Sequence, residues 1–223
     1  MFDYYKMLWW DSFSEKYFDY LIELIKKINI ETHHDLACWS WHFVWKMLKN
    51  NFFSTGSNIS DEQIKIAQDR YWEKYFSVKD MTDFELDKKV DLITCNNDAI
   101  NHLYSLSEWE ELFTCVYKNL NEKWYFIFDF HTLDKINNTE KSINQYQLEE
   151  YDIEDLEESI WNNFYRSKAI IKFNNKIIKI LKSYHTSFNY KNIMDILLLS
   201  WFRKYIELSI STKERKYILA FKN

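Results

Sequence analysis

The chain has 223 residues, 47% of them hydrophobic, which excludes a disordered chain and is enough for one domain with a large core. Its formal net charge of −5 comes without a basic block, which argues against a nucleic-acid binder, because such proteins present a positive face. No apolar run approaches the roughly 18 residues of a membrane span, and we therefore expect a cytoplasmic protein with no membrane association.

The first thirty residues have the pattern of an amphipathic helix that follows a group of aromatic residues. Apolar side chains recur at helical spacing between Phe18 and Ile28. The segment before them, residues 4–10, holds two tyrosines and two tryptophans. Two interpretations stay open: a helix packed on the edge of a sheet, or a helical flap over a ligand.

Five short apolar segments then alternate with amphipathic helical segments. The expected strands are 33–38, 52–55, 75–78, 90–95 and 125–130, and the expected helices are 41–50, 60–70 and 107–120. Ser60 and Gln63 have the spacing of a capping box, and Ser107 is expected to cap the third helix. Near-continuous apolar strands that alternate with helices are typical of a mostly parallel, doubly wound α/β sheet.

Residues 131–190 break this alternation. The stretch 147–158 is dense in acidic residues and is interpreted as a solvated insertion, whereas 169–173 and 177–181 are predicted to be two strands of a hairpin. The last expected elements are a helix and an antiparallel pair of strands: 190–200, 205–209 and 217–221.

Four blocks along the chain resemble the motifs of class I S-adenosylmethionine-dependent methyltransferases of the small, stand-alone bacterial type. HHDLACWSWHF is similar to the first motif, a strand followed by D-L-A-C/G and a glycine turn. STGSNIS with DEQIKIA is similar to the second strand and its helix, VKDMTDF to the third block, and VDLITCNNDAINHL with NLNEKWYFIFDF to the fourth and fifth. The resemblance implies a single domain, 1–223, with a Rossmann-like doubly wound seven-stranded sheet whose antiparallel last strand lies between strands five and six. It is weakest in 131–190, which it implies to be a substrate lid.

The resemblance also implies an activity, the direct transfer of a methyl group from S-adenosylmethionine to a small molecule or an unidentified acceptor. In this family the cofactor lies across the C-terminal ends of the strands, as ligands do in open α/β sheets. The implied cofactor-binding residues are Tyr5 in the flap, Asp35, Ala37, Trp39 and Trp41 at the methionine part, Asn58 at the ribose, Asp80 and Met81 at the adenine, and Asn96 beneath the sulfonium. The implied substrate-facing residues are Asn97, Asp98 and His131.

The chain departs from the family pattern mainly where the family has glycine. It holds one Gly, no Pro and ten Trp, whereas average usage is about 7% Gly and 5% Pro. Four tryptophans, Trp39, Trp41, Trp124 and Trp201, stand at glycine positions of the pattern, and Asn58 replaces the usual acidic residue. One hypothesis is that the written sequence misreads glycine codons, since UGA and GGA differ in one base and genetic codes exist that read UGA as Trp or as Gly. In the chain as written, we expect the indoles of Trp39 and Trp41 to fill the cofactor pocket or to lie at its mouth, and so to weaken the binding of S-adenosylmethionine.

The sequence does not support a metal site or a disulfide framework. Cys38, Cys95 and Cys115 form no CxxC pair, so reduced thiols are expected. His33 and His34 are neighbours in an expected strand and face opposite sides of it, which makes a shared metal ion difficult.

His131 follows the fifth expected strand, at a position that faces the substrate in this architecture. It is a candidate base, and the other interpretation is a polar residue at the rim of the site. The same two interpretations apply to His185, near the expected lid. Methyl transfer depends mainly on in-line positioning, so a base is not required. The sequence favours a methyltransferase, with a cofactor-free binding or interaction protein on the same fold as the alternative. We also expect Asp129 to lie on the same edge of the sheet as Asp35 and Asn58.

Overall fold

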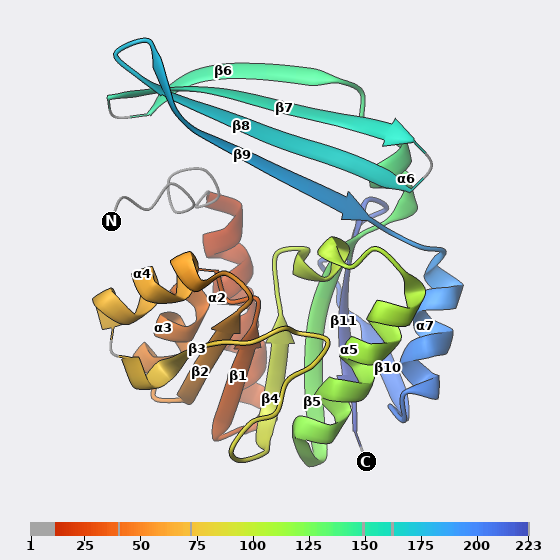
Figure 1. The fold of residues 1–223 in the computed structure, drawn as a ribbon. Coiled ribbons are helices and arrows are strands. Elements are labelled where there is room, and N and C mark those ends of the chain that lie inside the picture. The colour runs from red at the N-terminus through yellow and green to blue at the C-terminus, as the bar shows by residue number, and fades with distance from the viewer. Residues whose placement is uncertain (1–11, 40, 72, 149, 162, 223) are drawn as a thin grey trace.

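The computed structural model describes residues 12–39, 41–71, 73–148, 150–161 and 163–222. They form a seven-stranded sheet flanked by helices and a four-stranded sheet that lies over one edge of the first (Figure 1). Tyr5 and the other aromatic residues of the segment 4–10, which belong to the expected flap, lie outside the described residues.

The elements of the larger sheet follow the alternation seen in the sequence. Its strands are β1 (Thr32–Leu36), β2 (Phe53–Asn58), β3 (Phe76–Val78), β4 (Val90–Cys95), β5 (Leu120–His131), β10 (Lys204–Glu207) and β11 (Arg215–Phe221). The helices are α2 (Ser12–Ile28), α3 (His42–Lys49), α4 (Asp61–Tyr71), α5 (Leu106–Asn119) and α7 (Tyr190–Leu199), with the short 3-10 turns η1 (Glu73–Tyr75) and η2 (Ala99–His102). The strand order is β10-β11-β5-β4-β1-β2-β3, and β11 is antiparallel to both of its neighbours. The implied antiparallel last strand, inserted between strands five and six, is therefore confirmed.

Apolar clusters cover both faces of this sheet. On one face α2 and α3 pack on the strands, and Leu21, Ile25 and Phe43 share a cluster with Leu92 and Ile127. On the other face α5 and α7 pack on β4, β5 and β11 (Figure 1). This double coverage explains why the central strands are apolar throughout rather than alternating. Within the described ranges, the helices are too short or too polar to cross a bilayer.

The C-terminal ends of β1, β2, β4 and β5 meet at one edge, because these four strands run parallel to one another. Asp35 and Asn58 lie at the ends of β1 and β2, Asn96 follows β4, and Asp129 lies near the end of β5. The predicted shared edge is thus confirmed. This is the edge at which ligands bind in open α/β sheets.

The inserted segment forms a second sheet, which contains the predicted hairpin of 169–173 and 177–181 and in which most of the acidic run is a strand. Its elements are α6 (Leu133–Asn138), β6 (Ser142–Leu148), β7 (Tyr151–Trp161), β8 (Phe164–Phe173) and β9 (Lys176–Thr186), and its strands are antiparallel in the order β6-β7-β8-β9. Acidic side chains of β7 pair with basic ones of β8: Glu158 contacts Arg166 directly opposite, and Glu154 lies 3.5 Å from Lys172. Such cross-strand pairs stabilise a sheet, and they explain why the acidic run is a strand.

Two helix starts differ from the sequence predictions. Ser105, not Ser107, caps α5: its hydroxyl accepts from the N–H of Glu108, whose carboxylate accepts from the N–H of Ser105. At α4 the hydroxyl of Ser60 accepts from the N–H of Gln63 at 3.3 Å. The side-chain amide of Gln63, however, is buried without a hydrogen bond to the described residues, so the reciprocal half of this box is missing.

Candidate functional site

Asp35 lies at the end of β1 in a closed hydrogen-bond network. It is 3% exposed, and its Oδ1 accepts from the hydroxyl of Thr94 and from the amide of Asn96 at 3.0 Å. Burial raises the pKa of Asp35 to about 7, although the hydrogen bonds from Thr94 and Asn96 lower it. Two implied cofactor residues, Asp35 and Asn96, are therefore in direct contact across neighbouring strands.

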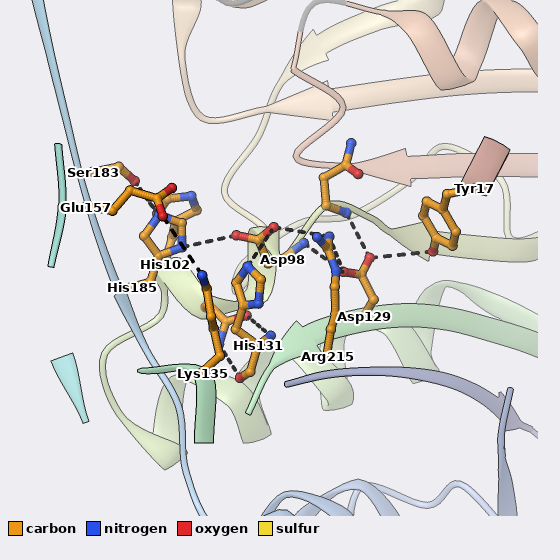
Figure 2. Close-up of polar contacts among 12 residues, drawn as sticks. Tyr17, Asp98, His102, Asp129, His131, Lys135, Glu157, Ser183, His185 and Arg215 are labelled. Carbon is orange, nitrogen blue, oxygen red and sulfur yellow. Dashed lines mark hydrogen bonds and ion pairs between the residues drawn. The ribbon is translucent and has the colours of Figure 1, made fainter. Parts of the chain in front are cut away.

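A second network joins β5 to the turn after β4. Asp129 is fully buried and accepts from the N–H groups of Asn97 at 2.8 Å and Asp98 at 3.0 Å. Asn97 and Asp98 have φ of 56° and 50°, a left-handed conformation that Asn and Asp tolerate. Arg215 of β11 donates from Nε to Asp129 at 2.7 Å, and the hydroxyl of Tyr17 lies 3.5 Å from the same carboxylate (Figure 2). The turn is thus anchored by a buried ion pair.

Asp98 connects this edge to the inserted sheet. Its carboxylate lies 3.1 Å from Nδ1 of His185 in β9, 3.6 Å from Nε2 of His131 in β5, and 3.1 Å from the guanidinium of Arg215 (Figure 2). Burial opposes ionisation, but interactions with His131, Arg215 and His185 outweigh it and hold the pKa of Asp98 far below its usual value. Asp98, one of the residues that the resemblance implies to face the substrate, contacts groups from three strands as a carboxylate.

His131, the candidate base, has one nitrogen near Asp98 and one without a partner. Burial lowers its pKa to about 4, despite the nearby charge of Asp98, so the ring is neutral at pH 7. At 3.6 Å, the distance from Nε2 to the carboxylate of Asp98 is too long for a hydrogen bond, so this contact does not fix the tautomer of the ring. Nδ1 is buried and makes no hydrogen bond to the described residues. His131 is therefore a neutral ring beside Asp98.

Sequence reasoning did not connect His102 with the inserted sheet. Nδ1 of His102 lies 3.2 Å from the carbonyl oxygen of Tyr184, and its ring is 4.4 Å from that of His185. The hydroxyl of Ser183 lies 2.9 Å from Nε2 of His185 and 3.4 Å from Nδ1 of His102. No local signal brings these residues together, because the contact depends on β9 passing over η2.

Three tryptophans have backbone conformations that favour glycine. The φ angle is 51° at Trp39, 114° at Trp41 and 76° at Trp201. Trp201 directly follows the C-cap residue of α7, the position at which glycine most often ends a helix. A bulky residue at such angles is an outlier and costs about 1–2 kcal/mol. Near the start of β5, the left-handed residue is Lys123, with φ of 67°, and not Trp124.

The two indoles of the first turn point to different places. Trp39 is partly exposed, and its ring lies 6.4 Å from that of His102. Trp41 is 6% exposed and packs 4.3 Å from Tyr71, in a cluster that includes Val44 of α3 and Ile64 of α4. The expectation that both indoles lie in the pocket or at its mouth is corrected for Trp41, because α3 and α4 enclose its ring.

The residues implied for the ribose and the adenine lie after β2 and β3. Asn58 is buried, and its side-chain oxygen accepts from the N–H of Ser60 at 2.8 Å. Asp80 is exposed and accepts from the N–H and the hydroxyl of Thr82, both at 2.8 Å. Met81 packs partly buried against the apolar cluster of α5. Asn58 therefore lies at the shared edge, whereas the carboxylate of Asp80 stabilises the local turn by its hydrogen bonds to Thr82.

These side chains fit part of S-adenosylmethionine. The buried carboxylate of Asp35 suits an ammonium group, and the amides of Asn58 and Asn96 suit hydroxyl and amine groups. The indole of Trp39 fits poorly, because it lies beside His102 at the end where the methionine part is expected.

The described residues contain no group of three or more His, Cys, Asp or Glu side chains placed to hold a metal ion. His33 and His34 lie on opposite sides of β1, as predicted, since Nδ1 of His33 contacts Ser54 at 2.7 Å and Nδ1 of His34 contacts Thr55 at 2.8 Å. Both rings are buried, and burial lowers the pKa of each, so they are neutral structural groups.

Comparison with known proteins gives a short sequence match and extensive structural matches. No protein-family model matches the chain. A provisionally named methyltransferase of Geobacillus sp. (strain WCH70) is 26% identical over 106 residues. That match covers 46% of this chain and 43% of the relative, so the chain is aligned with less than half of it.

The solved structures match over nearly the whole chain. An S-adenosylmethionine-dependent methyltransferase from Clostridium acetobutylicum ATCC 824 has a TM-score of 0.82 at 18% identity, covering 98% of this chain and 96% of that one. An amino pentose methyltransferase from Micromonospora echinaspora has a TM-score of 0.77 at 12% identity, covering 97% and 98%. A sugar N-methyltransferase from Streptoalloteichus sp. ATCC 53650 has a TM-score of 0.79 at 12% identity, covering 92% and 86%. The chain therefore has the fold of class I S-adenosylmethionine-dependent methyltransferases.

Proposed function

We propose that this protein is an S-adenosylmethionine-dependent methyltransferase whose acceptor is the amine nitrogen of a small molecule. The observation that carries the proposal is the edge formed by Asp35, Asn58 and Asn96, in a chain with this fold. Two similar structures are named as an amino pentose methyltransferase and a sugar N-methyltransferase, which supports an amine as the acceptor.

The chain's own residues would do the binding and positioning. When bound, the cofactor supplies an electrophilic methyl group on its sulfonium. Asp35 would face the ammonium group and Asn58 a ribose hydroxyl, while Asn97 and His131 would line the acceptor side. The inserted sheet over the edge would exclude water, which strengthens polar contacts in the site. Positioning of the two reactants accounts for most of the rate that such a site needs.

The test is to incubate the chain with S-adenosylmethionine and a panel of amino sugars, and to measure S-adenosylhomocysteine and the methylated product. Thermal unfolding in the presence of S-adenosylhomocysteine gives an independent binding readout, because a ligand at one hundred times its dissociation constant adds roughly 2.7 kcal/mol of stability. Product formation that disappears in Asp35→Leu would support the proposal. Binding without turnover on amines would contradict the acceptor class alone.

The second candidate is a cofactor-free binding or interaction protein on the same fold. The position of Trp39 favours it, because the indole narrows the methionine end of the site. This candidate predicts no shift in unfolding temperature at millimolar S-adenosylmethionine, either for the written chain or for a variant in which the turn carries glycine.

A further inference from the structure

His102 lies between two walls of the proposed site. On one side its ring faces the indole of Trp39, in the turn after β1, at 6.4 Å. On the other side it packs against His185 of the inserted sheet at 4.4 Å (Figure 2). These walls are the expected methionine end of the cofactor and the lid. His102 therefore borders the space where the methyl group and the acceptor would meet.

The contacts of His102 fix where its proton lies. The carbonyl oxygen of Tyr184, 3.2 Å from Nδ1, only accepts hydrogen bonds, so Nδ1 carries the hydrogen. Burial, and then the charge of His185, lower the pKa of His102 to about 4, so the ring is neutral at pH 7. Nε2 then holds a lone pair. No described residue forms a hydrogen bond with this Nε2. It is also absent from the buried polar atoms that lack a partner, so it is open to a ligand.

We propose that His102 orients the acceptor: its Nε2 accepts a hydrogen bond from an N–H group of the amine. The inference rests on the proposed function and adds a residue that the family resemblance did not supply. A neutral imidazole suits this place, because it does not repel the positive sulfonium, whereas an imidazolium would. The main-chain carbonyl of Tyr184 belongs to β9, so the folding of the inserted sheet itself fixes the tautomer of His102.

The first test measures the tautomer of His102 in the chain as written. Long-range proton–nitrogen correlation spectra distinguish a protonated Nδ1 from a protonated Nε2, and the signals are assigned by their loss in His102→Phe. We expect a neutral ring with the proton on Nδ1 from pH 8 down to about pH 5, because the pKa of His102 lies at about 4. A proton on Nε2, or an imidazolium at pH 7, would overturn the inference whatever ligands bind.

The second test compares two ligands, S-adenosylhomocysteine and sinefungin, in the variant Trp39→Gly, Trp41→Gly. Sinefungin carries an amine in place of the sulfonium methyl group and so presents N–H donors beside His102. We expect sinefungin to bind about tenfold more tightly than S-adenosylhomocysteine, as one hydrogen bond to a charged group would give. Isothermal titration calorimetry measures both dissociation constants.

Two substitutions of the same residue separate hydrogen bonding from packing. His102→Phe keeps a ring against His185 but has no acceptor, and it should abolish the preference for sinefungin. His102→Gln supplies an amide oxygen near the position of Nε2, and it should retain most of the preference. Affinity for S-adenosylhomocysteine should be equal in all three forms. Equal affinities for the two ligands with His102 intact would overturn this inference alone, whereas no binding of either ligand would overturn the proposed function together with it.

Discussion

Two turns at the same edge of the sheet both hold residues in the left-handed backbone conformation, but the side chains at these positions differ. The turn after β4 places Asn97 and Asp98 in the left-handed region, and the N–H groups of both donate to the buried Asp129. The turn after β1 places Trp39 and Trp41 at φ of 51° and 114°. Asn and Asp tolerate this conformation, whereas a tryptophan is strained there.

The difference shows that the charged groups around the turn after β4 are paired, whereas the turn after β1 holds two strained tryptophans. Asp98 and Asp129 have their charges compensated by Arg215, which also ties β11 to the edge. In the turn after β1, the indole of Trp39 lies near the ring of His102, and the indole of Trp41 lies between α3 and α4. The sheet can therefore be stable while the turn after β1 is strained, and the experiments below separate these two properties.

The largest expected effect on stability is at the intact turn. Arg215→Met removes the cation between Asp98 and Asp129 and leaves two buried carboxylates without compensation, which should lower the free energy of unfolding by about 3–5 kcal/mol. Urea unfolding measures this. Lys213→Met is the control, because its side chain is 81% exposed and pairs only at the surface with Asp134, so we expect a change below about 1 kcal/mol. Similar losses in the two variants would contradict the role given to the buried pair.

A pH-dependent effect of similar size is expected at Asp35, which lies near the end of β1. Burial raises its pKa from 3.8 to about 7, so the folded state holds the proton more tightly than the unfolded state. The contribution of Asp35 to stability is therefore greatest below pH 4 and is lost as the pH rises to about 7, by a total on the order of 4 kcal/mol. The difference in free energy of unfolding between the wild type and Asp35→Asn should show this slope between pH 4 and 7. A difference that does not change with pH would contradict the raised pKa.

The strain of a tryptophan in the left-handed backbone conformation can be measured at Trp201, which lies away from the site. Trp201 has φ of 76° and is 71% exposed, so Trp201→Gly should remove strain with little loss of burial and stabilise the protein by about 1–2 kcal/mol. Trp161 is 64% exposed but lies in the extended strand β7. Trp161→Gly should destabilise by about 0.5–1 kcal/mol. Changes of the same sign in thermal unfolding would show that strain does not distinguish the two positions.

The hypothesis that glycine codons are misread has a direct chemical test. If Trp39, Trp41 and Trp201 are glycines in the native host, the intact mass of protein purified from that host is lower than the written mass by one Trp-to-Gly difference per position. Peptide mass spectrometry would place each difference. Tryptophan at all three positions would reject the hypothesis and would leave the strain as a property of the natural protein.

The sequence predicted those parts of the molecule that depend on local pattern and strand direction. The apolar segments located β1 to β5, and parallel strands then placed Asp35, Asn58 and Asp129 at one edge. Only β8 and β9 of the inserted sheet were predicted in part, and β7 was not, because its acidic side chains are matched by basic ones on β8 only after folding. The contacts of His102 with β9 could not be predicted for a similar reason, since they join residues about eighty positions apart. The burial of Trp41 likewise depends on how α3 and α4 pack.

The central claim is that the tryptophans of the turn after β1 are the main obstacle to the proposed binding of the cofactor at this edge. Calorimetric titration with S-adenosylmethionine tests it most directly, on the written chain, on Trp39→Gly, Trp41→Gly, and on the same variant with Asn58→Asp. The account predicts weak or undetectable binding by the written chain, clear binding by the double variant, and tighter binding once an acid faces the ribose. Micromolar binding by the written chain would contradict the claim, as would a folded double variant that gives no heat of binding.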